Sequence, residues 1–165
     1  MVDLKKLQTS HAQEEDPFAY DLIERMFFGY RDFVGVADEA LHQTGYGRAH
    51  HRVLHFVDRH PGLTVGALLK ILKVTKQGVS RVLKTLVDDG LITVTPGSDR
   101  REKCLSTTAE GHTLARHLAE VQTTRIEAAM AAAGADNREI IAAFLAGLVD
   151  QNERDDVLAI IADGR

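Results

Sequence analysis

The stretch VTKQGVSRVLKTLVDDG, from Val74 to Gly90, decides the predicted fold. Its apolar residues recur at the spacing of one buried helix face: Val79, Val82, Leu83, Leu86 and Val87. The opposite face carries only cations, an amide and a hydroxyl: Lys76, Gln77, Ser80, Arg81 and Lys84. Solvated helices usually mix both signs of charge, because opposite charges three or four residues apart stabilise them. A face without carboxylates therefore raises the question of what it contacts.

Local signals on either side of this stretch predict the order of the elements. Asp16 followed by Pro17 favours a helix start, Thr75 caps the helix of the quoted stretch, and Asp88-Asp89-Gly90 terminates it. The expected helices cover residues 18–43, 48–59, 65–72, 75–88, 108–133 and 137–161, and the expected strands cover 91–95 and 102–106. The fold class is therefore mainly α with a small β-hairpin wing. Residues 46–110 form a winged helix-turn-helix, and residues 1–45 and 111–165 form flanking helices.

The charge distribution supports a polyanionic partner. The net charge is −4, but residues 46–116 hold 12 Lys and Arg against 6 Asp and Glu. The two flanks together hold the other 8 basic and 18 acidic residues. A basic centre between acidic ends indicates that the centre meets the polyanion, although chance segregation would give the same pattern.

In a helix-turn-helix the second helix enters the DNA major groove. Gln and Arg side chains can read bases there, whereas Ser, Thr and Lys mostly hold phosphates. Gly78 either permits close approach to the groove wall or packs against the preceding helix. Arg100 and Arg101 lie at the predicted wing tip, where arginines reach a narrow minor groove, and Asp99 is expected to hold one of them. The predicted DNA-binding residues are Thr75, Lys76, Gln77, Ser80, Arg81, Lys84, Ser98, Asp99, Arg100 and Arg101.

The run PGLTVGALLKILKVTKQGVSRVLKTLVDDGLITVTPGSDRREKCLSTTAEG resembles the winged helix-turn-helix of the MarR family of bacterial transcriptional regulators. The D-R-R triplet of Asp99–Arg101 and the L-x-x-T-x-x-G pattern of Leu105, Thr108 and Gly111 follow the family's wing signature. Thr107 departs from it, because the family usually has leucine at that position.

The resemblance implies a homodimer built from the N- and C-terminal helices. The apolar residues of the last predicted helix agree with this, because they exceed what a small monomer easily buries. A two-fold dimer asks for an inverted-repeat operator in double-stranded DNA. We therefore expect a repressor of a palindromic promoter site that a small-molecule effector relieves.

Three features are candidates for sensing a signal. An effector pocket is predicted near Tyr30, Phe33, His42, Tyr46 and His51, although these residues can equally be core and hinge. His51 and His55 could bind zinc with Glu39, His112 or His117, but no obvious third and fourth ligands lie nearby in the sequence, and we predict no metal and no cofactor. Cys104 is either an oxidant-sensitive thiol or a small buried hydrophobe.

Other classes of protein fit less well. The histidines with Asp38, Glu39 or Asp58 could in principle catalyse proton transfer, but the sequence has no nucleophile motif and no phosphate-binding glycine loop, so an enzyme is not expected. A winged helix that binds protein would usually lack the cationic face. No run approaches the roughly 18 apolar residues of a membrane span. The N-terminus lacks a signal peptide's apolar core and there is one cysteine, so a cytoplasmic location is expected.

Overall fold

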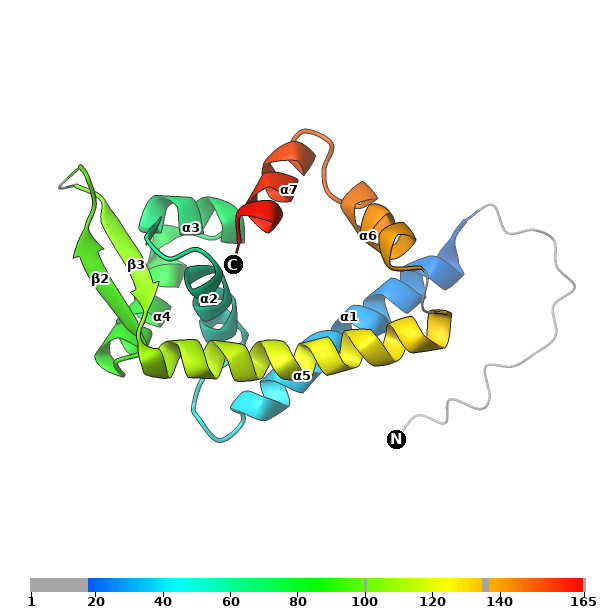
Figure 1. The fold of residues 1–165 in the computed structure, drawn as a ribbon, viewed down its shortest axis with the longest axis horizontal. Helices are drawn as coiled ribbons and strands as arrows, with labels where there is room; N and C mark the ends of the chain where they lie inside the picture. The colour runs from blue at the N-terminus through cyan, green and yellow to red at the C-terminus, as the bar shows by residue number, and fades with distance from the viewer. Residues whose placement is uncertain (1–17, 100, 135–136, 165) are drawn as a thin grey trace, which may run out of the picture. The chain divides into compact units, whose positions relative to one another are not determined.

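The computed structural model describes residues 18–99, 101–134 and 137–164 (Figure 1). The chain divides after Asp32 into a short N-terminal unit and a larger unit that begins at Phe33. The elements are α1 (Tyr20–Leu41), α2 (Arg48–Arg59), β1 (Leu63–Thr64), α3 (Val65–Leu72), α4 (Lys76–Asp88), β2 (Ile92–Pro96), β3 (Lys103–Thr107), α5 (Ala109–Ala133), α6 (Arg138–Gly147) and α7 (Arg154–Asp163). The mainly α fold with a small wing is confirmed, whereas the predicted helix start at Asp16 and Pro17 lies outside the described residues.

The core of the larger unit joins the helix-turn-helix to its neighbours. Nine large side chains are almost completely buried, and they come from α1 to α5 and from the sheet: Leu41, Val53, Leu54, Val57, Leu68, Leu86, Ile92, Leu105 and Leu118. Helix α2 packs against α3, α4 and β3, so its buried residues link both parts of the winged domain. Helix α4 and the wing are thus built on one shared core.

The sheet has three strands in the order β1-β3-β2, all antiparallel. The hairpin of β2 and β3 agrees with prediction, but the two-residue strand β1 was not predicted. Leu63 pairs with Leu105 and Thr64 pairs with Cys104. Thr64 is also the N-cap of α3, because its hydroxyl oxygen accepts a hydrogen bond from the Ala67 N–H at 3.1 Å. A strand of two residues is too short to show a periodicity of its own, so the sequence did not reveal it.

The predicted single helix over residues 137–161 is wrong, because the structure has two helices, α6 and α7. Between them the Asp150 carboxylate accepts a hydrogen bond from the Asn152 N–H at 2.9 Å, and the Asp150 carbonyl accepts from Glu153 N–H at 3.0 Å. Such local bonds compete with helical ones. The Arg154 guanidinium then donates to the carbonyls of Gly147 and Val149, which closes the end of α6. Apolar periodicity continues across this turn, which explains the error.

Within the described ranges, none of the helices combines the length and apolar composition that crossing a membrane requires.

Candidate nucleic-acid interface

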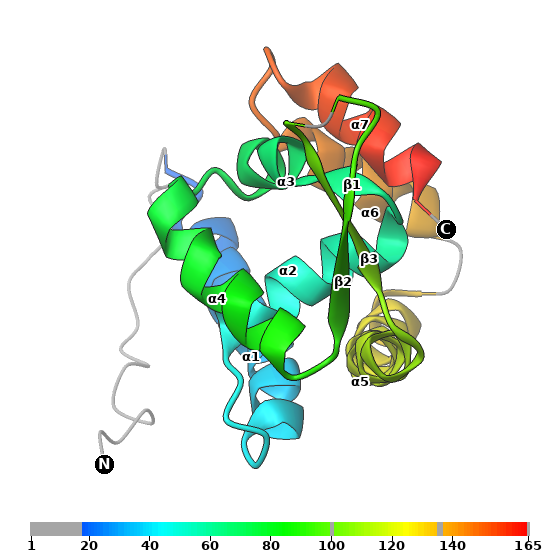
Figure 2. The same ribbon diagram turned by 90° about the vertical axis from the view of Figure 1, so that its left-hand side faces the viewer.

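Helix α4 presents one buried and one exposed face, as its sequence pattern predicts. Val79, Val82 and Leu86 are buried, and Leu83 is half-buried. Val87 was predicted to be buried but is 36% exposed, although its neighbour Leu86 is fully buried. The six predicted DNA-contacting residues of this region are all exposed: Thr75, Lys76, Gln77, Ser80, Arg81 and Lys84. Figure 2 shows α4 beside the β2–β3 hairpin on the side that faces the viewer.

The N-terminal end of α4 is a favourable place for phosphate. The Thr75 hydroxyl oxygen accepts a hydrogen bond from the Gly78 N–H at 3.3 Å, so this hydroxyl fixes the helix start and keeps its own proton free to donate. Free backbone N–H groups and the helix dipole attract anions at such an end. Lys76 and Arg81 add full charges in the same half of the helix. Lys84 differs, because its ammonium is paired with Asp88 one turn further on.

Gly78 has open space around it within the protein. A β-carbon at this position would meet only the Thr75 hydroxyl oxygen, at 3.5 Å, which is an ordinary contact distance. The alternative that Gly78 packs against the preceding helix is therefore wrong. Close approach to DNA stays a prediction for this residue.

The wing tip is a tight turn organised by Asp99. Its carboxylate accepts a hydrogen bond from the backbone N–H of Arg101 at 2.9 Å, and its carbonyl accepts from the Glu102 N–H at 2.8 Å. Asp99 thus holds the backbone of Arg101, whereas the sequence suggested that it would hold a guanidinium. Ser98 and Arg101 are exposed at the turn, and Arg100 lies outside the described residues.

The pattern L-x-x-T-x-x-G is explained by the joint between the wing and α5. Leu105 is buried, and Thr108 caps α5 by accepting from the Gly111 N–H at 3.1 Å. The Thr108 hydroxyl also donates to the Gly90 carbonyl at 2.7 Å. At Gly111 a β-carbon would lie 2.0 Å from the Leu91 carbonyl oxygen, so only glycine fits. These contacts fasten the end of α4 and the base of the wing to α5.

Thr107, which departs from the family pattern, has a polar partner. Its hydroxyl donates to the Asp58 carboxylate at 2.8 Å, and His112 Nδ1 lies 2.9 Å from the same oxygen. The Asp58 side chain is only 13% exposed, so these partners replace the water that it loses. No spacing rule connects residues so distant in sequence, and the sequence therefore did not reveal this group.

The five residues of the predicted effector pocket have different surroundings. In the N-terminal unit Tyr30 is about half exposed; in the larger unit His42 is exposed, while Phe33 and His51 are half-buried. Tyr46 donates its hydroxyl to Asp89 at 2.8 Å, which ties the start of α2 to the end of α4. Burial and then this bond raise the pKa of Tyr46 to about 12.

Two prominent cavities lie among the described residues of the larger unit, and none of these five residues lines either of them. One, of about 1100 Å³, lies between α3 and α7, and the other, of about 550 Å³, lies between α2, the end of β3 and α5. The second cavity contains the Asp58, Thr107 and His112 group described above. The predicted effector pocket stays a prediction.

The histidines of α2 contact each other. His51 and His55 are one helical turn apart, with ring centroids separated by 6.3 Å, and burial lowers the pKa of each. Among the residues that the structure describes, no three His, Cys, Asp or Glu side chains are grouped so that they could hold a metal ion. Cys104 is half-buried on β3, between Thr64 and Thr95 on the neighbouring strands.

Comparison with known proteins agrees with this geometry. A sequence profile described as the MarR family matches residues 44–102. The HTH-type transcriptional regulator PetP of Rhodobacter capsulatus is 52% identical over 113 residues, which are 68% of this chain and 68% of PetP.

Solved structures share the fold. The transcriptional regulator SlyA matches 82% of this chain and 96% of its own with a TM-score of 0.68 and 17% identity. The Staphylococcus aureus MepR–DNA complex matches 80% and 97% with a TM-score of 0.62 and 22% identity. The family profile and PetP are those of transcriptional regulators, which are not enzymes. The chain contains a helix-turn-helix with this wing, and it is more than half identical to PetP over two thirds of its length. It therefore belongs to the MarR family of transcriptional regulators.

Proposed function

We propose that this regulator is a homodimeric repressor that binds an inverted repeat in a promoter and is released by a small-molecule effector. The observation that carries the proposal is the exposed face of α4, from Thr75 to Arg81, held on a buried back. Its cations and the backbone N–H groups at the N-terminal end of α4 suit phosphates, and Gln77 and Arg81 can form paired hydrogen bonds with bases. Ser98, Asp99, Arg100 and Arg101 of the wing complete the proposed interface. Because its target is the bacterial chromosome, we place the protein in the cytoplasm.

A second copy of the chain is the partner that suits the exposed apolar side chains. In the N-terminal unit Phe18, Ile23 and Phe27 are 60–64% exposed. On α6, Ile140 is 68% exposed and Phe144 is 51% exposed. Burying one such side chain stabilises an interface by about 1.5–3 kcal/mol, and a two-fold interface buries each of them twice, which offsets the entropy that association costs. Two-fold pairing would then present two copies of α4 to successive major grooves.

The dimer is tested by placing charge on α6. Phe144→Glu should convert the protein to a folded monomer, since the side chain is exposed within a single chain. Ala142→Glu, at an exposed position on the other side of α6, serves as the control. Sedimentation velocity measures the mass, and circular dichroism checks that both variants are folded. A Phe144→Glu protein that still sediments as a dimer would exclude α6 from the interface.

The regulatory function is tested by selecting genomic fragments with the purified protein at about 150 mM salt and footprinting the tightest one. We expect protection of an inverted repeat whose half-sites lie about one helical turn apart. Effectors are then sought among metabolites related to the adjacent genes, by the loss of that footprint. Weak binding that ignores sequence and disappears with salt would contradict a specific repressor.

A further inference from the structure

Lys73 occupies the turn of the helix-turn-helix in an unusual backbone conformation. It follows α3 with φ 51° and ψ 44°, and it is the one non-glycine residue with positive φ in the part of the chain that the structure describes. Glycine or asparagine is favoured at such a position, because a β-carbon crowds the neighbouring backbone. Lysine here indicates that the side chain has a use that offsets this strain.

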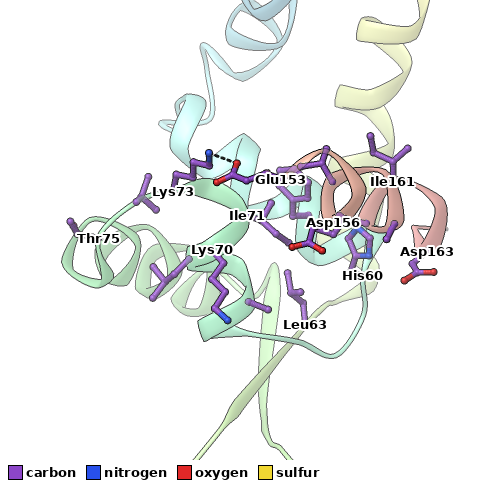
Figure 3. Close-up of a pocket in the computed structure, with 17 residues that line it drawn as sticks. His60, Leu63, Lys70, Ile71, Lys73, Thr75, Glu153, Asp156, Ile161 and Asp163 are labelled. Atoms are coloured by element: carbon purple, nitrogen blue, oxygen red, sulfur yellow. Dashed lines mark ion pairs between the residues drawn. The ribbon is translucent and has the colours of Figure 1, made fainter. Parts of the chain in front are cut away.

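The Lys73 side chain reaches across to the beginning of α7. Its ammonium pairs with the carboxylate of Glu153, the residue that precedes α7, as Figure 3 shows. The hydrogen bond that Lys73 donates to Glu153 raises the pKa of Lys73, and the charges of Glu153 and Asp150 add to this. Both side chains are largely solvent-exposed, at 65% for Lys73 and 44% for Glu153. Exposed pairs of this kind are weak and are screened by salt, so the ammonium can exchange one partner for another.

Close packing does not hold α7 against α3 around this ion pair. The two helices line the cavity of about 1100 Å³, and Ile71 and Ile161 face it (Figure 3). The same cavity is lined by Thr75, which caps the recognition helix. The ion pair between Lys73 and Glu153 thus links the segment before α7 to the turn before α4.

The backbone of Lys73 lies two residues before Thr75, next to the end of α4 that suits a phosphate. In a helix-turn-helix this region lies against the DNA backbone. The long, flexible lysine side chain can pair with Glu153 or with a phosphate, but one ammonium cannot do both at full strength. Lys73 was not among the residues predicted to bind DNA, because its role is visible only once Glu153, 80 positions away in sequence, is placed beside it.

We propose that Lys73 is a DNA-phosphate contact and that Glu153 occupies it in the DNA-free protein, so that the start of α7 competes with DNA for the turn. The proposal rests on the DNA-binding function proposed above, and it adds a contact residue and an internal competitor. Removing the competitor should strengthen binding to any DNA sequence, because a phosphate contact carries no base information.

The test measures binding of the full-length protein to a random-sequence 24-base-pair duplex by fluorescence anisotropy at several salt concentrations. Glu153→Gln should tighten binding by about two- to fivefold per DNA-binding domain. The slope of log affinity against log salt should change little in this variant, because Lys73 neutralises the same phosphate in the DNA complex of both proteins. Lys73→Gln should weaken binding and flatten that slope. Adding Glu153→Gln to the Lys73→Gln variant should then leave its DNA affinity and salt dependence unchanged.

Asp155→Asn is the matched control, because it removes the same charge from the first turn of α7 at an exposed position that does not line the cavity. Equal effects of Glu153→Gln and Asp155→Asn would overturn the proposal in favour of a general charge effect. Weaker binding by Glu153→Gln would overturn it too, since Glu153 would then position the turn rather than block it. If the wild-type protein bound neither this duplex nor a selected genomic fragment, the DNA-binding function itself would fail. Wild-type binding that Glu153→Gln leaves unchanged would refute only the competition.

Discussion

Gly78→Ala separates the stability of the recognition helix from its function. Gly78 is the third residue of α4, where alanine is favoured over glycine by about 1 kcal/mol in helix propensity. The new methyl group would meet only the Thr75 hydroxyl oxygen, at 3.5 Å, so the protein has room for it. We therefore expect the variant to be more stable, with a melting temperature raised by about 2–4 °C for a chain of this size.

DNA binding should change in the opposite direction. If Gly78 lies against the groove wall, the methyl group enters a tightly packed contact, where an added carbon typically costs about 1–3 kcal/mol. Since each 1.4 kcal/mol is a factor of ten in the binding constant, the loss of affinity is roughly five- to a hundredfold. A more stable protein that binds DNA less well cannot be explained by unfolding.

Gly66→Ala provides a matched control on the neighbouring helix. Gly66 lies near the start of α3, and a β-carbon there would also meet only the hydroxyl oxygen of its helix cap, Thr64, at 3.9 Å. Thermal melts and anisotropy titrations against the selected fragment measure both properties for the two variants. Gly66→Ala should gain stability and keep its affinity. A Gly78→Ala protein with unchanged affinity would refute the close approach to DNA, and one with reduced stability would refute the packing argument.

Three further results are expected. Arg81→Ala and Arg101→Ala should each weaken binding of the selected fragment by about 1–3 kcal/mol. Neither should lower the melting temperature, because both side chains are exposed. Unchanged affinity in both variants would exclude α4 and the wing from the interface. Gly111→Ala should lower the free energy of unfolding by about 1–3 kcal/mol in denaturant titrations, because its β-carbon would overlap the Leu91 carbonyl, whereas Gly147→Ala has open space and should not. Burial lowers the pKa of His51 and His55, so the unfolded chain takes up protons at a higher pH than the folded protein does, and the free energy of unfolding should fall as the pH drops below about 6.5. Equal melting temperatures at pH 7.5 and pH 5.5 would contradict this. Replacing His55 with Gln should reduce the difference in melting temperature between the two pH values.

The sequence predicted those features that depend on neighbours in the chain. Helix α4 was predicted because its apolar spacing and its cap at Thr75 are both contained in a few residues. The sequence did not predict the end of α6 or the exposure of Val87. Apolar periodicity alone shows neither where a helix ends nor which of its apolar residues other elements bury. Strand β1 was missed because it exists only through its pairing with β3.

The candidate site was predicted unevenly for the same physical reason. Exposure of α4 follows from its amphipathic pattern, so the DNA-contacting face could be proposed from the sequence. Asp99 holds Arg101 through the backbone N–H, a detail that the sequence pattern did not specify, because a carboxylate in a turn can bond the backbone as easily as a guanidinium. The pairs of Asp58 with Thr107 and of Lys73 with Glu153 join distant residues, and only tertiary structure brings such residues together.

These contacts limit how a signal could change DNA affinity. The end of α4 is tied to α2 by Tyr46 and Asp89, and the Gly90 carbonyl that follows is tied to α5 by Thr108. The recognition helix and the wing are therefore expected to move as one body, and an effector would gain little by shifting one against the other. The beginning of α4 is different, because an exchangeable ion pair joins the turn before it to the segment that precedes α7. A signal that repositions the C-terminal helices would thus reach the proposed DNA interface first through Lys73, at the end of α4 where we propose that phosphate binds.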